Sequence, residues 1–403
     1  MKQLVICSSF PFSTHTFITR EIAETLDRGH DVVILSPVEG DEPGRKLAQR
    51  LGIGVERIIY ADVLKSPVFS FNWQRFTHRI SRAGQVEVYG RKLAEMRKSY
   101  FVELLKNPLL KNVDIIHSHF IGWSYELAMP LSELLGVPFT CTAHNSFLDK
   151  LPHYYFEALQ DKSLITFPSK SFRDIWVGKT QREENLHVVP NAVAVSEFLP
   201  TDYYLDKTFL GLITVSRLTQ VKRIADALYA LHRLHENRVF FHYTIVGSGP
   251  EEVALRHLAA SLNIGSNVTF LGNQPHDRVI TELQKNDICI HPSENESFGV
   301  AVVEAMAAGL PVVAARSGGT QETVVHGETG LLYQPGDIDA LTSGLIKLAG
   351  DVQMRASYGR AGSARVNRNY TWDGHMKAMC DIWNSAISEH LVPVVFPRRV
   401  EER

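Results

Sequence analysis

Residues 294–315 read ENESFGVAVVEAMAAGLPVVAA, an almost entirely apolar run interrupted by acids. Glu296 and Glu304 are separated by seven residues, with an FG turn after the first. The alanine- and valine-rich part favours a helix, and PVVAA favours a short buried strand. A carboxylate at Glu304 is unexpected on the edge of such a helix, because desolvating an ionised group without partners costs free energy. Vicinal hydroxyls of a ligand would supply such partners, since carboxylates only accept hydrogen bonds.

Strand-like and helix-like segments alternate through the whole chain. The first half carries the strand-like runs LVICSS, DVVILS, DIIHSH, PFTCTAH, LITFPS and LHVVPN. The second half carries LGLITVSRL, FHYTIVGSGP, NVTFLG, DICIHPS, PVVAA and GLLYQPGD. This order predicts an α/β fold of two doubly wound domains with parallel sheets. We expect domains at 1–200 and 207–371, a join near DYYLDK, and a final helix at 372–390 that crosses back to the first domain.

Bulk composition limits the class of protein. The chain has 403 residues, 44% of them hydrophobic, and a net charge of -2, which argues against a general nucleic-acid binder. Its four cysteines lie far apart without metal-ligand spacing, so we expect small core residues in a reducing compartment. The N-terminus does not read as a signal peptide, and no apolar stretch is long enough to span a bilayer. A cytoplasmic location is predicted.

The segment 65–111 differs from the rest of the chain. It holds ten Lys or Arg against three Glu, a local charge of +7, with seven interleaved aromatic residues. A solvated helical face over core aromatics would explain this composition. A surface that docks on anionic lipid headgroups, at the inner face of the cell membrane, would explain it equally well.

Several motifs together resemble glycosyltransferase family 4. They are, in order, FP near the start, RGHDVVIL, DIIHSHF, TAHNSF, VVPNAV, SRLTQVKR, VGSGPEE, VTFLG, HPSENESFGVAVVEAMAAGLPVVAARSGG and GETGLLYQPGD. The resemblance covers essentially the whole chain and is strongest from 216 to 337. It implies the GT-B fold, in which two Rossmann-like domains face a central cleft. It also implies a retaining, metal-independent transfer of a sugar from a nucleotide diphosphate.

The resemblance assigns roles to the opening stretch. Glu304 would accept hydrogen bonds from the ribose of the donor, and Glu296 would hold hydroxyls of the transferred sugar. Phe298, Gly299 and Val300 would offer backbone N–H groups to the diphosphate at a helix start. An exposed helix edge that carries acids by chance is the alternative interpretation.

Two cations follow the strand in SRLTQVKR. Arg217 and Lys222 match the family residues that bind the diphosphate, where negative charge develops as the glycosidic bond breaks. Many family members have Gly after the Lys, whereas Arg223 stands there in this chain. The sequence therefore leaves open which cation points inward. An exposed basic turn is the alternative.

Histidines and the first loop supply further candidates. His144 matches a family histidine near the transferred sugar, and His117 and His119 lie on one face of a strand. We interpret His119 as lining the cleft and His117 as structural, because no third metal ligand is evident. The first loop has 13–16 reading STHT where many members have GG, so Thr14 is a diphosphate candidate. A helix N-cap by Thr14 or Thr16 explains the same residues.

Two short motifs have simpler explanations. Gly247 and Gly249 would form the turn beside the nucleotide base, although a tight turn without a ligand explains GxG equally. Asp337 and Asp339 form a DxD, the metal motif of another transferase fold. They follow a turn and begin a helix here, so N-capping is expected and no metal site is predicted.

The predicted function is a retaining transferase of the hexosyltransferase type. It would move a sugar from a UDP-sugar, or a GDP-sugar, to a hydroxyl acceptor in cell-surface polysaccharide or lipid-linked glycan synthesis. The C-terminal domain would bind the donor and the N-terminal domain the acceptor. A small natural-product acceptor, a sugar-nucleotide 2-epimerase of the same architecture and a non-catalytic sugar-nucleotide sensor are the alternatives.

Overall fold

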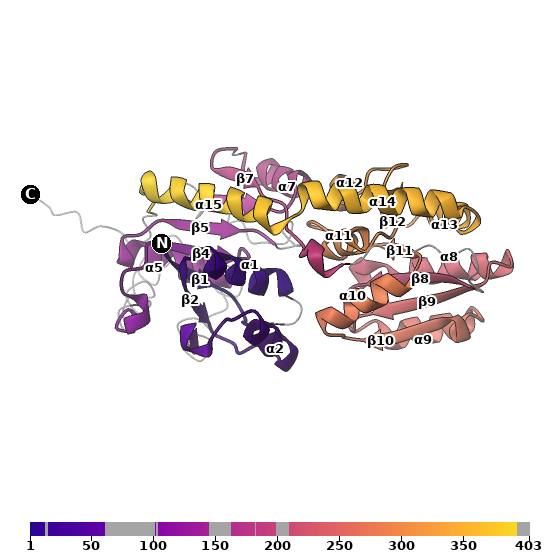
Figure 1. The fold of residues 1–403 in the computed structure, drawn as a ribbon, viewed down its shortest axis with the longest axis horizontal. Coiled ribbons are helices and arrows are strands. Elements are labelled where there is room, and N and C mark those ends of the chain that lie inside the picture. The colour runs from indigo at the N-terminus through magenta and orange to yellow at the C-terminus, as the bar shows by residue number, and fades with distance from the viewer. Residues whose placement is uncertain are drawn as a thin grey trace, which may run out of the picture. The chain divides into compact units, whose positions relative to one another are not determined.

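The structure is a computed structural model, shown as a ribbon in Figure 1. The residues that it describes are 1–12, 15–60, 101, 104–144, 163–181, 183–198 and 209–392. Thr14, the predicted join between domains and all but 101 and 104–111 of the basic segment 65–111 lie outside them. The chain divides into two compact units. One comprises Met1–Thr166, Lys179–His187 and Ala378–Arg403, and the other Phe167–Gly178 and Val188–Lys377.

The N-terminal sheet has seven strands in the order β3-β2-β1-β4-β5-β6-β7. Its strands are β1 Lys2–Ile6, β2 Asp31–Ser36, β3 Ile58–Tyr60, β4 Ile115–His119, β5 Phe139–Thr142, β6 Leu164–Phe167 and β7 Leu186–Val188. The helices among them are α1 Thr16–Asp27, α2 Glu42–Arg50, α5 Trp123–Leu135 and α7 Lys170–Thr180. The ladders from β3 to β6 are parallel. The six strands predicted in this half are confirmed, and β3 is an addition.

The C-terminal sheet has six strands in the order β10-β9-β8-β11-β12-β13, all paired in parallel. They are β8 Leu210–Val215, β9 Phe241–Val246, β10 Val268–Gly272, β11 Ile288–His291, β12 Val312–Ala315 and β13 Gly330–Tyr333. The helices between and after these strands are α8 Ile224–Glu236, α9 Glu252–Ser261, α10 His276–Lys285, α11 Val300–Ala307, α12 Thr320–Thr323, α13 Ile338–Gly350 and α14 Val352–Asn369. The last helix, α15 Trp372–Ser388, begins in the second unit, and its residues from Ala378 on belong to the first. Short 3-10 helices include η1 Val55–Arg57, η3 Pro108–Leu110, η5 Val195–Glu197, η6 Gln220–Lys222 and η7 Gly265–Asn267.

Both faces of the C-terminal sheet are buried, which explains why its strands read as continuous apolar runs. Leu212 and Ile290 belong to one hydrophobic cluster, whereas their neighbours Ile213 and Cys289 belong to another. Successive side chains of a strand point to opposite faces, so each strand contributes to both clusters. Helices cover the two faces, as Figure 1 shows for α8 and α11. This is the doubly wound arrangement that the sequence predicted.

Strand order gives each sheet a topological switch point. In the first sheet, β2 lies on one side of β1 and β4 on the other. In the second sheet, β9 and β11 flank β8 in the same way. Loops that leave the carboxyl ends of the two central strands diverge at such a switch point, where α/β proteins bind their ligands. The candidate residues should therefore follow β1 and β4, and β8 and β11.

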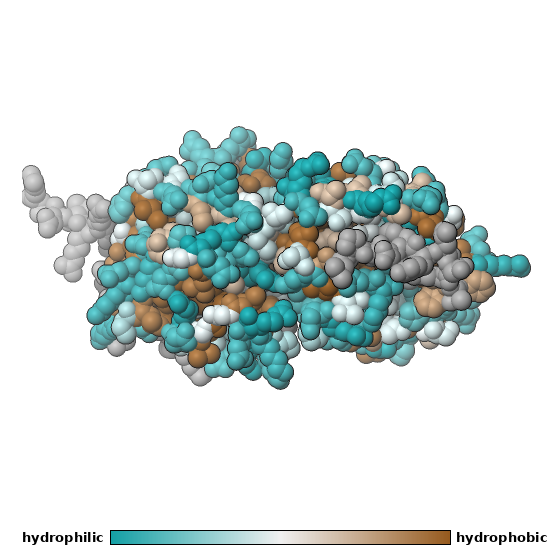
Figure 2. Space-filling view, viewed as in Figure 1, coloured by the Kyte–Doolittle hydropathy of each residue, from teal (hydrophilic) through white to brown (hydrophobic). Residues whose placement is uncertain are grey.

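The cysteines, the surface and the helix lengths bear on the predictions from composition. Cys7, Cys141, Cys289 and Cys380 are all free thiols. The first three are buried, as predicted, whereas Cys380 is only half-buried, so the prediction of a core position is wrong for it. In the view of Figure 2, the surface is mostly hydrophilic with small separate hydrophobic patches. Within the part of the chain that the structure describes, no helix is both long enough and apolar enough to cross a membrane.

Candidate functional site

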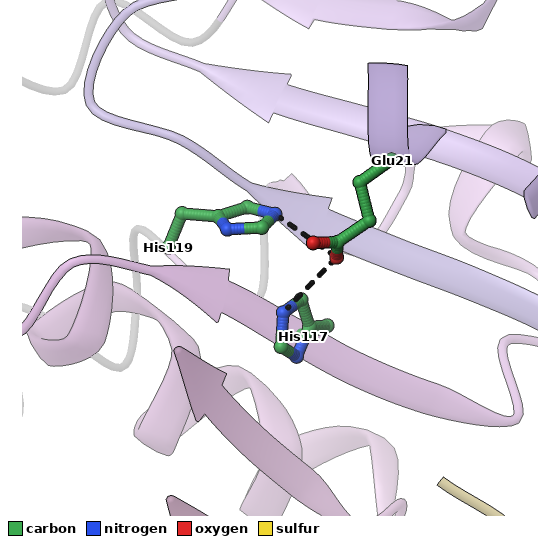
Figure 3. A group of neighbouring side chains, drawn as sticks. All are labelled: Glu21, His117 and His119. Atoms are coloured by element: carbon green, nitrogen blue, oxygen red, sulfur yellow. Dashed lines mark ion pairs between the residues drawn. The ribbon is translucent and has the colours of Figure 1, made fainter. Parts of the chain in front are cut away.

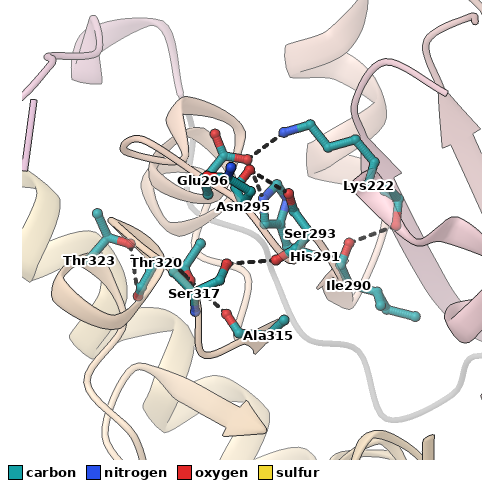
Figure 4. Close-up of polar contacts among 11 residues, drawn as sticks. Lys222, Ile290, His291, Ser293, Asn295, Glu296, Ala315, Ser317, Thr320 and Thr323 are labelled. Atoms are coloured by element: carbon teal, nitrogen blue, oxygen red, sulfur yellow. Dashed lines mark hydrogen bonds and ion pairs between the residues drawn. The ribbon is translucent and has the colours of Figure 1, made fainter. Parts of the chain in front are cut away.

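Lys222 and Glu296 meet at the switch point of the C-terminal sheet (Figure 4). Lys222 ends the 3-10 helix η6 after β8, and Glu296 lies in the loop after β11. The Lys222 ammonium donates to Glu296 Oε2 at 2.5 Å, and His291 Nε2 lies 3.0 Å from the same oxygen. Side-chain exposures of 15% and 14% for the ion pair show that it is largely shielded from water. Two predicted residues are thus brought together by the topology.

Burial and charge act against each other at Glu296. Burial by itself would raise the pKa of this carboxyl, because water no longer stabilises the ionised form. The Lys222 charge and the hydrogen bond from His291 outweigh burial and hold the pKa of Glu296 well below its usual range. Glu296 is therefore an ionised acceptor at neutral pH. It can accept hydrogen bonds from hydroxyls on a neighbouring sugar.

Arg223 pairs with two other carboxylates. Its backbone is left-handed, with φ of 49°, at the position where many family members have glycine. Its guanidinium donates to Asp226 Oδ2 at 2.7 Å and to Glu294 Oε2 at 3.0 Å, and these two carboxylates raise its pKa. Lys222 is therefore the cation beside Glu296, which resolves the alternative that the sequence left open. Arg217 is exposed in the loop after β8.

A glycine pair holds the Glu296 loop in place. Gly319 N–H donates to the Glu296 carbonyl at 2.8 Å. A Cβ atom on Gly318, whose φ is 43°, would lie 2.0 Å from the same carbonyl oxygen. The Ser317 hydroxyl donates to the Ser293 carbonyl at 2.6 Å, so the loop is tied at two points (Figure 4). Only glycine permits this approach of the two backbones.

Glu304 is buried on α11, so the interpretation of an exposed helix edge is wrong. Its Oε1 lies 3.6 Å from His276 Nδ1, and His276 Nε2 lies 3.5 Å from Glu197 Oε2. Burial raises the pKa of Glu304, the His276 charge opposes this rise, and the Glu197 charge adds to it. The His276 imidazole lies between the carboxylates of Glu304 and Glu197 and so partly offsets the free energy cost of burying Glu304 in an apolar helix.

The structure places a helix start at the residues predicted to offer N–H groups. Gly299, with φ of 90°, is the N-cap, and Val300 is the first helical residue. The N–H groups of Val302 and Val303 donate to the Gly299 carbonyl, while those of a helix's first residues lack an intrahelical acceptor. The Phe298 ring is in the core, 5.5 Å from the Tyr370 ring, so only its backbone can serve a ligand.

The two short motifs have structural roles, the GxG motif in loop packing and the DxD motif at a helix start. A Cβ atom on Gly247 would lie 1.9 Å from the Ser216 carbonyl oxygen, and one on Gly249 would lie 2.2 Å from that of Leu218. The glycines thus allow the loops after β8 and β9 to pack on each other. Asp337 is the N-cap of α13 and accepts from Ala340 N–H at 2.9 Å, as predicted. Its neighbour Asp339 pairs with Arg233.

His144 follows β5 and lies in a buried aromatic setting. Its ring centroid is 4.6 Å from that of Phe17 and 5.2 Å from that of Phe120. His119 is fully buried and reaches His144, with 3.1 Å between Nδ1 and Nε2. The interpretation of His119 as a residue that lines the cleft is therefore wrong.

The predicted N-cap at Thr16 is also wrong. The helix α1 begins at Thr16, so its N-cap is His15, whose side chain makes no capping hydrogen bond.

Some residues of the site were missed in the sequence. His291 is the last residue of β11 and His276 the first of α10, so each stands where a functional side chain is common. Glu21 lies close to His117 and His119 (Figure 3) and is the third potential ligand that the spacing did not reveal. It comes from α1, far away in the sequence. No periodicity links these partners, because each pair forms only when the sheet is assembled.

Solved structures of other proteins share the fold of this chain. Alr3699/HepE of Anabaena, solved in complex with UDP-glucose, superposes with a TM-score of 0.74 at 18% identity, over 95% of this chain and 99% of that one. The two Rossmann-like units and this neighbour show the GT-B fold. The model for glycosyltransferase family 4 matches residues 15–197, and that for glycosyl transferases group 1 matches 197–365. The chain belongs to glycosyltransferase family 4.

Two curated relatives illustrate the range of the family. The amylovoran biosynthesis glycosyltransferase AmsK of Erwinia amylovora is 25% identical over 387 residues, which are 87% of this chain and 91% of the relative. The D-inositol 3-phosphate glycosyltransferase of Acidothermus cellulolyticus is 30% identical over 309 residues, 68% of each chain. This protein is therefore a glycosyltransferase of the GT-B type.

Proposed function

We propose that the protein is a retaining hexosyltransferase that moves a sugar from a UDP-sugar to a hydroxyl of a growing cell-surface glycan. This proposal is based on the ion pair between Lys222 and Glu296 at the switch point. His291 lies within hydrogen-bonding distance of the same Glu296 oxygen. A cation and an ionised acceptor held side by side fit a donor whose phosphate and sugar hydroxyls are adjacent. The ribose of the donor would extend toward Glu304.

Each side chain has a role in the proposed reaction. Lys222 and Arg217 would stabilise the diphosphate as it leaves, and the N–H groups at the start of α11 would add backbone donors. Glu296 would orient the transferred sugar through its hydroxyls. His144 would contact that sugar, as the family resemblance implies. In the front-face mechanism that the resemblance implies, the leaving phosphate takes the proton of the acceptor, and no side chain acts as nucleophile.

The choice of donor and acceptor follows from the relatives. AmsK is named for the synthesis of amylovoran, and HepE was solved with UDP-glucose. These names support a glycan acceptor and a uridine donor, and a GDP-mannose-dependent mannosyltransferase of Corynebacterium glutamicum, 33% identical over 202 residues, makes a GDP-sugar the alternative donor. Because Lys222 supplies positive charge beside the proposed diphosphate position, we propose that no divalent metal is required.

A thermal-shift panel tests the proposed donor. UDP, GDP, ADP and their common sugars are added to the full chain with and without EDTA. A ligand at a hundred times its Kd should add about 2.7 kcal/mol of stability. A UDP-specific shift that is insensitive to EDTA and weaker in Glu304→Gln, but unchanged in the exposed Glu328→Gln, is the expected result. A shift that needs metal, or one that is equal for all nucleotides, would contradict the proposal.

A turnover assay separates the transferase from an epimerase. The UDP-sugar is incubated alone and then with a lipid-linked hydroxyl acceptor, and both sugar nucleotide and glycan products are analysed. We expect the donor to be consumed only with acceptor and the anomeric configuration to be retained. Conversion to an epimeric sugar nucleotide without acceptor would overturn the assignment.

A further inference from the structure

Two donors converge on one oxygen of the Glu296 carboxylate (Figure 4). Lys222 Nζ lies 2.5 Å and His291 Nε2 lies 3.0 Å from Oε2. In the part of the chain that the structure describes, no other group is bonded to this carboxylate. A carboxylate has about four acceptor positions on its two oxygens, so Oε1 keeps its own positions for a ligand.

The fold holds the two donors with different firmness. His291 is the last residue of β11, its backbone pairs with Ala314 of β12, and its side chain is only 3% exposed. Lys222 ends the 3-10 helix η6, and its ammonium is carried on a flexible four-carbon chain. His291 is therefore the fixed donor at Oε2.

Lys222 has a second task in the proposed reaction, in which it binds the leaving diphosphate. An ammonium has three N–H donors, so it can contact Oε2 and a phosphate oxygen together. The position of the ammonium is then set by the phosphate as well as by Glu296. The orientation of the Glu296 carboxylate therefore depends on His291.

The backbone around Glu296 is held separately from its side chain. Glu294 N–H donates to the Val221 carbonyl at 3.0 Å, and Gly319 N–H donates to the Glu296 carbonyl at 2.8 Å. These bonds fix the loop after β11, but they do not fix the rotation of the Glu296 side chain. Among the described residues, the contacts at Oε2 determine which way the carboxylate turns.

We propose that His291 is a positioning residue for the donor sugar. Its Nε2–H holds Oε2 of Glu296 and so turns Oε1 toward a hydroxyl of the transferred sugar. Because a carboxylate only accepts hydrogen bonds, Nε2 has to carry a proton. This inference rests on the proposed function, in which Glu296 contacts that sugar. His291, Lys222 and Glu296 all belong to the second unit, so the proposed contact needs no group of the first.

A histidine that only fills the end of β11 is the alternative interpretation. It would stabilise the second unit without orienting Glu296, and its replacement would affect all ligands of that unit alike. The two interpretations therefore differ in how a substitution changes the binding of the sugar relative to that of the nucleotide.

Titration calorimetry with the full chain distinguishes the two interpretations. The Kd is measured for UDP and for the UDP-sugar that gives the largest shift in the thermal panel. In His291→Phe, which has a ring without a donor, the ratio of the Kd for the UDP-sugar to the Kd for UDP should rise roughly tenfold, near the lower limit for losing a hydrogen bond to a charged group. His291→Gln, whose amide can donate to Oε2, should restore the ratio to near its wild-type value.

His242→Phe is the matched control. His242 lies near the start of β9, at the end of the parallel sheet opposite to His291, and its Nε2 lies 3.0 Å from Thr269 Oγ1. This variant loses a histidine hydrogen bond outside the site, so the ratio of the two Kd values should not change.

Nuclear magnetic resonance tests the contact without any donor sugar. The full chain is labelled with 15N-histidine, the His291 signals are assigned by their loss in His291→Gln, and long-range correlations show which nitrogen is protonated. We expect a proton on Nε2 in the wild type. Because the strand fixes the donor, we expect the same in Lys222→Ala.

Several results would overturn the proposal. They are an unprotonated Nε2 in the wild type, an unchanged ratio in His291→Phe, equal losses of affinity for UDP and the UDP-sugar in that variant, or no restoration in His291→Gln. If His291→Phe does not fold, His291→Asn replaces it under the same criteria, because its shorter amide does not reach Oε2.

Glu296→Ala separates this inference from the proposed function. If Glu296→Ala raises the ratio and His291→Phe does not, Glu296 keeps its proposed role and the role of His291 alone fails. If Glu296→Ala leaves the ratio unchanged, the proposed contact of Glu296 with the sugar fails, and the role of His291 fails with it, whatever the spectra show.

Discussion

Lys222 and Arg223 are adjacent cations with different partners, which makes them a natural pair for mutagenesis. Lys222 contacts Glu296 in the site, whereas Arg223 contacts Asp226 and Glu294. We predict that Lys222→Ala lowers kcat by at least about a hundredfold, since it removes a charge that would stabilise the leaving diphosphate. Steady-state kinetics with a UDP-sugar donor measures this effect.

Arg223→Ala is the matched control for that prediction. It removes the same charge one residue away, so kcat should stay within a fewfold of the wild type. Because Lys222→Ala also leaves Glu296 buried with one partner fewer, its thermal unfolding must be compared before the rates are interpreted. Equal losses in the two variants, or a larger loss in Arg223→Ala, would remove Lys222 from the mechanism.

The burial of the Glu304 carboxyl, which its proposed role requires, should lower the stability of the fold. Its pKa is raised by burial, so the folded state disfavours the ionised form at neutral pH. This cost appears as the pH rises above the ordinary carboxyl pKa and is complete above the raised one. We predict that Glu304→Gln raises Tm at neutral pH by roughly 2–4 °C, the shift that ~1 kcal/mol gives in a domain of this size. Differential scanning calorimetry measures the change.

The same variant should bind the donor more weakly. Hydrogen bonds to a charged group contribute about 1.5–3 kcal/mol, so losing the carboxylate should weaken UDP binding roughly ten- to a hundredfold. Titration calorimetry gives the Kd. A variant that is more stable and binds equally well would show that Glu304 has no contact with the nucleotide.

At the scale of elements, the loop after β12 fixes the loop after β11. Gly318 and Gly327 both have positive φ, but only Gly318 approaches another backbone. We predict that Gly318→Ala displaces the Glu296 carbonyl, lowers stability by more than about 2 kcal/mol and lowers donor affinity. Gly327→Ala has left-handed strain without a clash and should keep donor affinity. Urea unfolding and titration calorimetry distinguish the two variants, and equal effects would contradict the argument.

The fold was largely predictable from sequence because its elements have strong local signals. The buried strands of the C-terminal sheet are apolar on both faces and are bounded by glycine turns, so pattern alone located them. β3 was missed because it has only three residues, of which Ile59 alone is buried. The Thr16 N-cap was wrong because the helix begins one residue earlier than the capping pattern requires.

The candidate site was predictable only where one motif contains it. Glu296, Glu304 and Lys222 were assigned through the resemblance to the family, whereas the contact between Lys222 and Glu296 was not predicted. His291, His276 and Glu21 are contacts made across elements, so they depend on strand order and not on spacing. The sequence also could not orient Arg223, because one of its carboxylate partners, Glu294, lies in the loop after β11.

At the scale of the whole molecule, the two site carboxylates have opposite effects on the pH dependence of folding. Glu296 has a lowered pKa and Glu304 a raised one. A lowered carboxyl pKa contributes stability above the ordinary value, whereas a raised one costs stability there. The site should therefore contribute to the acid limit of stability through Glu296, and it should limit stability at neutral pH through Glu304.

We predict that the stabilising effect of Glu296 is lost in acid. The contribution is fully present above the ordinary carboxyl pKa, near 4.5, and disappears as the pH falls toward the lowered pKa of the folded state. The difference in unfolding free energy between wild type and Glu296→Gln should therefore be largest near pH 7 and shrink between pH of about 4.5 and 3. Urea unfolding at a series of pH values measures it, with the exposed Glu236→Gln as control. A difference that stays constant down to pH of about 3 would mean that Lys222 and His291 do not hold Glu296 in its ionised form.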